Sequence, residues 1–328
     1  MRAQGLNLAM AVGLLVAIVL SLFVGEVALS GEQYRQAFQD LASAPGEILW
    51  QVRAPRALAA ALTGGALGLA GAILQGLLRN PLADPGVLGV SATAAFMAAL
   101  VIVSGLALVP GAVETAAWIG ALACGGGLAL FTARVREPEA LILFGVAMSS
   151  FFGAATALVF NLSPSPIATA EVLAWLMGSV EARSWLDSLW AAPALFLALF
   201  LAMRAAPGLK MLTLGEVAAE ASGLRMGRLK MAAILGASLA TGAAVALAGV
   251  IGFVGLAAPH LVRRLAREDP ARLLIPSSLA GALILVAADV LARLVPTDQE
   301  LKLGVFTALI GAPLFALIAW RAARSWRT

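Results

Sequence analysis

Long apolar stretches separated by short polar segments dominate the chain. A helix needs about 20 apolar residues to cross the hydrocarbon of a bilayer, so stretches of this length predict membrane-spanning helices. Eight such stretches are clear, at 6–25, 57–78, 87–108, 113–133, 140–161, 187–204, 275–292 and 303–320. A longer polar segment at 162–186 is expected to hold a short interfacial helix near residues 171–177.

The apolar run 231–262 needs separate treatment, because its 32 residues carry no Asp, Glu, Lys or Arg. As one straight helix it would be about 48 Å long, too long for a hydrocarbon core of about 30 Å. Glycines at 249, 252 and 255 offer a place to turn, and basic residues flank both ends of the run. We therefore expect two shortish spans here, with a tight turn near 249–252 on the outer face, which makes ten spans in all.

Composition supports a membrane protein. Of the 328 residues, 61% are hydrophobic and 12% are charged, whereas a soluble domain is about half apolar and a quarter charged. A single cysteine, Cys124, excludes an internal disulfide, and a single histidine, His260, excludes a multi-histidine metal site. The expected fold class is all-α and polytopic, with one transmembrane domain over residues 1–328.

The distribution of charge predicts the topology. With ten spans and both termini on the same side, 16 of the 22 Lys and Arg residues fall on that side and six on the other. Cytoplasmic loops of membrane proteins carry such an excess, so both termini are expected to be cytoplasmic. This distribution also accounts for the basic net charge without any nucleic-acid partner.

The segment 212–230 is a polar island on the predicted cytoplasmic face. Its first half is helix-forming and carries Glu216 and Glu220, Gly223 can end a helix, and the second half is basic. Two short helices meeting at a glycine would form a knob that a partner protein could grip. We take 205–230 as a cytoplasmic coupling loop.

Several kinds of chemistry are missing from the sequence. There is no phosphate-binding Gly-x-x-x-x-Gly-Lys-Ser/Thr motif and no plausible Ser–His–acid set, so the chain is not expected to be an enzyme. Ion-coupled carriers usually place ionisable residues inside the membrane, but Asp289 and Glu114 lie near span ends. The energy source is therefore expected on another subunit, with an ion-coupled secondary transporter as the alternative.

A set of motifs in the same order resembles the FecCD family, the permease subunits of type II ABC importers for iron–siderophore complexes, haem and cobalamin. The motifs are the Arg-x-Pro-Arg sequence at 53–56, the runs 71–91, 214–224 and 252–263, and the short matches at 288–293 and 304–313. The residues that carry the family motifs are Gln75, Arg79, Asn80, Pro81, Asp84, Pro85, Gly86, Gly252, Gly255, Pro259, His260 and Asp289.

The resemblance implies a cobalamin-importer-like permease fold in the inner (plasma) membrane. It further implies a homodimer with the pathway at its interface, two ATPase subunits that hold ATP and Mg, and a periplasmic or surface-tethered substrate-binding protein. No cofactor or metal is expected in this chain. The expected cargo is a metal chelate, an iron–siderophore complex or haem, with cobalamin as the alternative.

Two sets of site residues follow from the resemblance. The residues expected to couple to the ATPase are Leu214, Gly215, Glu216, Ala219, Gly223, Leu224, Arg225 and Arg228. Docking of the binding protein is assigned to Arg53, Arg56 and Arg293 on the outer face, since arginine suits the carboxylates of a partner. The alternative is that these three arginines are lipid anchors.

The sequence departs from the family pattern at two places. Glu300-Leu301-Lys302-Leu303 stands where the family usually has Glu-Leu-Pro, which changes how the last span begins. Ala92-Thr93 stands where the family often has Ser-Gly. Both departures bear on the pathway or the substrate rather than on the coupling loop.

Overall fold

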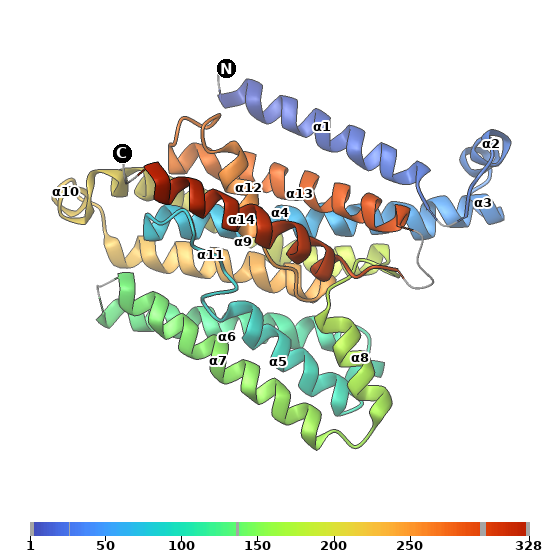
Figure 1. Ribbon diagram of the computed structural model, residues 1–328, viewed down its shortest axis with the longest axis horizontal. Coiled ribbons are helices and arrows are strands. Elements are labelled where there is room, and N and C mark those ends of the chain that lie inside the picture. Colours follow the sequence, from blue (N-terminus) through green and yellow to red (C-terminus); the bar gives the residue numbers. More distant parts are fainter. Residues whose placement is uncertain (1–2, 26, 136–137, 296–299, 326–328) are drawn as a thin grey trace.

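The protein is a bundle of long helices running in alternating directions (Figure 1). The computed structural model describes residues 3–25, 27–135, 138–295 and 300–325. The extreme termini, for which a cytoplasmic location is predicted, lie outside the described residues. Within the part described there are helices and no strand, which confirms the all-α fold class.

The elements follow one another along the chain with short connections. The α-helices are α1 Ala3–Phe23, α2 Gly31–Gln39, α3 Ala44–Glu47, α4 Ala54–Leu78, α5 Val90–Val103, α6 Ala112–Arg134, α7 Pro138–Leu162, α8 Pro166–Leu176, α9 Trp185–Met211, α10 Glu216–Ala221, α11 Met226–Ala248, α12 Val254–Val262, α13 Pro270–Leu294 and α14 Leu303–Ser325. A π-helical turn, Ile48–Arg53, joins α3 to α4, and short 3₁₀ turns cover Leu106–Leu108 and Leu212–Leu214.

Helix α4 is the centre of the bundle and is buried along nearly its whole length. Its glycines face the backbones of neighbouring helices: a β-carbon at Gly64 would collide with the carbonyl of Gly281, and one at Gly68 with that of Ser277. Small residues let helices approach closely in a membrane, where packing replaces the hydrophobic effect as the driving force. The glycine-rich sequence of α4 therefore serves packing between α4 and α13 within one chain.

The predicted spans agree with the helices. Each of the eight clear stretches has a helix at its place, and α8 occupies the position of the predicted interfacial helix. Seven helices among the described residues are long and apolar enough to cross a membrane. Together with α5, α12 and the described part of α14, they agree approximately with ten spans.

The run 231–262 differs in detail from the prediction. The chain breaks at the predicted glycines, but α11 takes 23 residues and α12 only nine. Nine residues rise about 13 Å, which is less than half of a hydrocarbon core. The expectation of two shortish spans is therefore corrected to one full helix, α11, and one short helix, α12.

The turn between α11 and α12 also lies deeper than expected. A β-carbon on Gly249 would collide with the carbonyl of Trp175, and Gly178 and Gly304 both pack against the carbonyl of Val250. The neighbouring Ile251 side chain is buried. The Gly249 part of the expected turn is thus covered by the end of α8, the segment after it and the start of α14, whereas Gly252 is half-buried with open space beside it.

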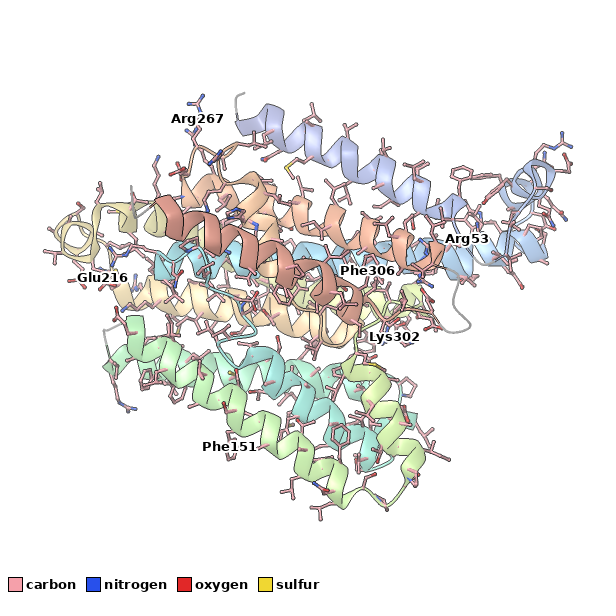
Figure 2. The ribbon with its side chains drawn as sticks, viewed as in Figure 1. Arg53, Phe151, Glu216, Arg267, Lys302 and Phe306 are labelled. Atoms are coloured by element: carbon pink, nitrogen blue, oxygen red, sulfur yellow. The ribbon has the colours of Figure 1, made fainter. Side chains whose placement is uncertain are left out.

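Two ends of the bundle carry the polar features. Helix α10 projects from one end, here called the α10 end, and α2 and α3 project from the other, here called the α2 end (Figure 1). Figure 2 shows Glu216 at the α10 end and Arg53 near the α2 end. The sites described below lie at these two ends and midway between them.

Candidate coupling and transport sites

The knob at the α10 end is residues 212–230, and its geometry depends on two glycines. Gly215 precedes α10 with φ +95°, and Gly223 follows it with φ +90°. The amide of Gly223 donates to the carbonyl of Glu220, and the amide of Leu224 donates to that of Ala219. This pair of bonds is a Schellman motif, which usually needs glycine at the left-handed position. The prediction that a helix ends at Gly223 is confirmed.

The knob presents apolar side chains to its surroundings. Leu214 is 70% exposed and Val217 is 84% exposed, whereas Ala219 is fully buried and ties α10 to the bundle. Sequence reasoning named Leu214 and missed Val217, whose isolated apolar side chain in a polar segment was the available signal. These two exposed apolar side chains on a projecting element are available to a partner protein, and contact with an ATPase stays a prediction.

The basic half of the knob begins α11. Arg225 occupies the N-cap position of this helix without a side-chain hydrogen bond to it, and Arg228 lies one turn further along. Both side chains are exposed. The structure thus brings the predicted coupling residues together in one projecting element, and their role in coupling remains a prediction.

At the α2 end, Arg53 points into the protein. Only 4% of the residue is exposed. Its Nη1 donates to the carbonyl of Leu22 and to the hydroxyl of Tyr34, both at 2.8 Å, and its Nη2 donates to the carbonyl of Val27. Arg53 therefore fastens the end of α1 and the start of α2 to the helical segment that enters α4.

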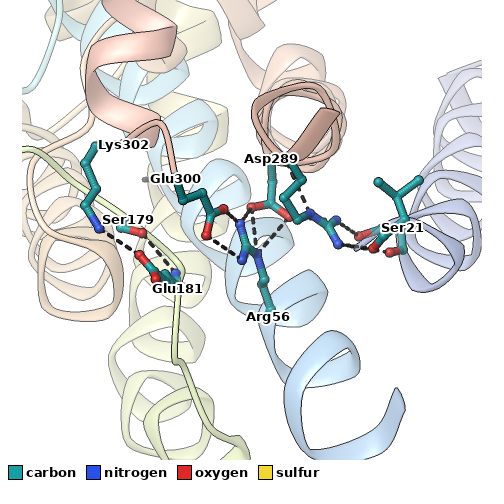
Figure 3. A network of polar contacts seen from close by, with 9 residues as sticks. Ser21, Arg56, Ser179, Glu181, Asp289, Glu300 and Lys302 are labelled. Carbon is teal, nitrogen blue, oxygen red and sulfur yellow. Dashed lines mark hydrogen bonds and ion pairs between the residues drawn. The ribbon is translucent and has the colours of Figure 1, made fainter. Parts of the chain in front are cut away.

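Arg56 and Arg293 share a buried carboxylate, Asp289 (Figure 3). Arg56 Nη2 lies 2.7 Å from Asp289 Oδ1, and Arg293 Nη2 lies 2.9 Å from Asp289 Oδ2. Arg56 Nη1 also donates to Glu300 Oε2 at 2.9 Å, and Arg293 Nη2 donates to Ser21 Oγ at 2.6 Å. Two cations and two anions thus compensate one another, which is the condition for burying charge in a protein.

This network changes the interpretation of the three arginines. Asp289 is fully buried and the side chain of Arg293 is 4% exposed, so a glutamate on an approaching protein would not reach them. The guanidinium groups of Arg53, Arg56 and Arg293 bond within the protein, and the alternative that these arginines act as lipid anchors stays a prediction. Docking by Arg53, Arg56 and Arg293 therefore stays a prediction, and Glu300 and Ser21 are partners of these arginines that the sequence did not indicate.

A second ion pair lies beside the network and involves the departure from the family pattern. Lys302 Nζ lies 2.7 Å from Glu181 Oε2, and both side chains are partly exposed. A backbone hydrogen bond joins the same two segments, since the amide of Gly304 donates to the carbonyl of Gly178 at 3.3 Å. The start of α14 is therefore tied to the segment between α8 and α9.

Most family-motif residues meet midway between the ends. A β-carbon at Gly71 would collide with the carbonyl of Gly255, and Gln75 donates to that carbonyl at 3.4 Å. Arg263 in turn donates to the amide oxygen of Gln75. The loop 79–89 lies against the start of α12, since a β-carbon at Gly255 would come within 3.0 Å of Asp84 Oδ2 and 3.3 Å of Pro85 Cδ.

The loop 79–89 has its own internal order. Arg79 ends α4 with φ +49°, and Asn80 Oδ1 accepts from the amide of Leu82 at 2.9 Å. Asp84 Oδ1 accepts from the amide of Gly86 at 2.7 Å. Non-helical backbone at membrane depth is tolerated where protein covers it, and these side chains satisfy part of its hydrogen bonding.

A cavity of about 220 Å³ lies where this loop faces the α11–α12 turn. Its lining residues are Leu67, Asp84, Pro85, Gly86, Ser91, Ala92, Val250, Ile251, Gly252 and Gly255. Pro81, Pro259 and His260 lie outside this lining, and the His260 ring is 6.3 Å from that of Phe315. Among the residues that the structure describes, no group of three or more His, Cys, Asp or Glu side chains could hold a metal ion.

The fold and these sites define a polytopic membrane transport subunit. The FecCD transport family matches residues 13–321, and the chain belongs to this family. It is 40% identical over 312 residues to the vitamin B12 import system permease protein BtuC of Vibrio cholerae, covering 93% of this chain and 90% of that protein. It is 38% identical over 327 residues to the probable siderophore transport system permease protein YfiZ of Bacillus subtilis, covering 95% and 94%.

A solved structure has the same fold. A chain described as a metal-chelate type ABC transporter in an inward-facing conformation superimposes with a TM-score of 0.84 at 31% identity, covering 97% of this chain and 99% of that chain. The expected family and fold are therefore confirmed. The relatives are ABC permeases, which are components of transporters.

Proposed function

We propose that this chain is the membrane-spanning subunit of an ATP-driven importer for a metal chelate. Family membership supports the transport class. The observation that carries the mechanism is the rigid knob at the α10 end, with Leu214 and Val217 exposed at its surface. A partner ATPase would bury this surface and hydrolyse ATP, since no phosphate-binding motif occurs in the sequence.

The knob can transmit motion because both of its ends enter long helices. Residue 212 follows α9 directly, and α11 begins directly after Arg225. A partner that grips α10 and changes shape would therefore move two helices of the bundle together. Helix α11 lies against α4, α6 and α9, so the movement would reach the centre of the fold.

The proposed orientation places the α10 end in the cytoplasm of a plasma or inner membrane. The excess of Lys and Arg on the predicted inner side supports it. A substrate-binding protein would then dock at the α2 end. There the internal arginines position the surrounding backbone instead of contacting the partner.

The proposed assembly is a homodimer with the pathway between two copies. Helix α7 supports this arrangement, because most of its apolar window is unburied within the chain. Its exposed large side chains include Leu143, Phe151 and Leu162, and Figure 2 shows Phe151 pointing away from the bundle. Leu309 and Ile310 on α14 are exposed in the same way.

The cargo is proposed at the level of its chemical class. Relatives are named for vitamin B12 and for siderophores, and the solved neighbour for metal chelates. An iron–siderophore complex, haem and cobalamin all belong to this class. The cavity at mid-depth is too small for any of them, so the cargo would travel along a surface shared with another subunit.

The ion-coupled alternative has little support in the structure. Asp289 is neutralised by Arg56 and Arg293, and Glu114 pairs with Arg183 at 3.6 Å. Both carboxylates are thus already engaged in ion pairs within the chain.

The proposal is tested by measuring uptake in cells whose chromosomal gene is deleted and in which a plasmid supplies the gene. Labelled cobalamin, haem and a siderophore panel are offered, with the cellular ATP level measured in parallel. We expect uptake of one cargo class that continues under an uncoupler while ATP is maintained. Uptake that stops with the proton gradient at constant ATP would establish the ion-coupled alternative instead.

A further inference from the structure

A pocket of about 370 Å³ lies between α9 and the start of α11 at the α10 end. Its lining combines three arginines with an apolar floor: Phe200, Leu201, Arg204, Pro207, Gly208, Met211, Leu224, Arg225, Arg228, Leu229 and Ala232. The lining contains no acidic residue. Its volume is in the range of small-molecule sites, about 300–1,000 Å³.

The three arginines have no compensation within the chain. Inside the described part of the protein, none of the guanidinium groups of Arg204, Arg225 and Arg228 has a hydrogen-bond or ion-pair partner. Their side chains are exposed. This separates them from Arg53, Arg56 and Arg293, whose guanidinium groups bond to partners within the protein. Three converging cations without an anion favour an anionic ligand.

The start of α11 adds to the attraction. This 23-residue helix has no side-chain cap on its N-terminus. A β-carbon at Gly227 would meet nothing within 4 Å, so the backbone of the first turn is open to a ligand. Uncapped amides at a helix N-terminus bind phosphate groups.

The position of the pocket identifies the kind of anion. Residues 188–203 of α9 carry no charge, and Arg204 is the first charged residue after them. Phe200 is 53% exposed, on a helix whose apolar window is mostly unburied. The pocket therefore spans a bilayer interface, with its arginines at headgroup level and its apolar floor beside the acyl chains.

We propose that this pocket binds one anionic phospholipid of the leaflet at the α10 end. The phosphodiester lies between Arg204, Arg225 and Arg228 and against the first turn of α11, and an acyl chain lies along Phe200, Leu201 and Leu229. Basic pockets between membrane helices recognise anionic headgroups in this way. The site joins α9 to the base of the knob, so the lipid holds the knob in place. The proposal depends on the membrane placement of α9 and not on the transported cargo.

The test uses the full permease in nanodiscs of phosphatidylcholine with a small fraction of phosphatidylglycerol. After gentle re-extraction, native mass spectrometry counts the phosphatidylglycerol retained. We expect one molecule per permease in the wild type and about five-fold weaker retention in Arg204→Gln. The matched control is Arg264→Gln, an exposed arginine outside the pocket, with wild-type retention expected.

Two further arms separate the other occupants. Soluble glycerol 1-phosphate at millimolar concentration should not displace the lipid, and its displacement would mean that the pocket is a free-phosphate site. ATPase binding is measured in pure phosphatidylcholine discs. Equal lipid retention in wild type and Arg204→Gln, with ATPase binding lost in the variant, would overturn the proposal and assign these arginines to the protein partner.

Discussion

Arg56 on α4 and Asp289 on α13, 233 residues apart in sequence, form a bidentate ion pair inside the protein. Arg56 Nη2 lies 2.7 Å from Asp289 Oδ1, and Arg56 Nε lies 3.3 Å from Asp289 Oδ2. Because Arg293 also binds Asp289 Oδ2 and Glu300 binds Arg56, the charges are balanced. The pair ties α4, α13 and the chain before α14 together at the α2 end.

Removing the shared carboxylate is expected to destabilise the protein strongly. Asp289→Asn leaves Arg56 and Arg293 buried with only Glu300 to compensate them, and breaking a buried pair costs about 3–5 kcal/mol. Thermal unfolding of the purified permease in detergent measures the loss. Glu32→Gln is the control, because Glu32 and Arg35 form a highly exposed pair, and its melting temperature should equal that of the wild type. A wild-type melting temperature in Asp289→Asn would show that the network is dispensable.

The ion pair Lys302–Glu181 should contribute little to stability. Both partners are partly exposed, and such pairs contribute about 0–1 kcal/mol. Lys302→Pro also restores the residue usual in the family, at a position just before α14 where proline is tolerated. We expect the free energies of unfolding of Lys302→Pro and Glu181→Gln to lie within about 1 kcal/mol of the wild-type value. A coupling energy well above this value in a double-mutant cycle would contradict the assignment.

Gly71→Ala and Gly126→Ala should act in opposite directions. The added methyl group at Gly71 collides with the carbonyl of Gly255 in the tight contact between α4 and α12, whereas at Gly126 on α6 it meets nothing within 4 Å. Overpacking costs about 1–3 kcal/mol, and alanine in an open helix gains about 0.5–1 kcal/mol over glycine. The free energy of unfolding of each variant is measured in the same detergent and compared with that of the wild type. Equal effects would mean that α4 and α12 can separate at little cost.

Gly223→Val should separate ATP hydrolysis from uptake while the protein still inserts. Valine at φ +90° is strained whatever space surrounds it, and here the surroundings are open, so the strain is confined to the Schellman turn of the knob. Uptake by cells and ATP hydrolysis in membranes from the same cells are measured together. We expect uptake to fall at least ten-fold while ATP hydrolysis is retained. A ten-fold fall corresponds to a loss of about 1.4 kcal/mol in the coupling free energy between hydrolysis and uptake.

Two matched variants control for the knob experiment. Gly223→Asn should keep most of the uptake, because asparagine tolerates the left-handed conformation better than other residues. Gly127→Ala lies on α6, where no positive φ is required and an added methyl group meets nothing within 4 Å, and should be neutral. Normal uptake by Gly223→Val would remove the knob from the transport mechanism.

The sequence by itself determined the helices, their order and the family. The length of an apolar stretch predicts a helix that crosses the membrane. Gly223 ends α10 because glycine adopts a positive φ without strain. These are local properties, so residues close in sequence are sufficient to define them. The knob was predicted for the same reason, since all its residues lie within one short segment.

The tertiary structure alone decided the partners of the charged residues and the depth of the broken segments. The positive charge of Arg56 suggested an outward role, but Asp289 and Glu300 approach it from elements more than 200 residues away. Likewise, nothing near 249–252 in sequence shows that Trp175, Gly178 and Gly304 cover the turn. Burial and pairing depend on which elements meet across the bundle, and this is decided by close packing of α4 with α12 and α13, which local hydropathy does not encode.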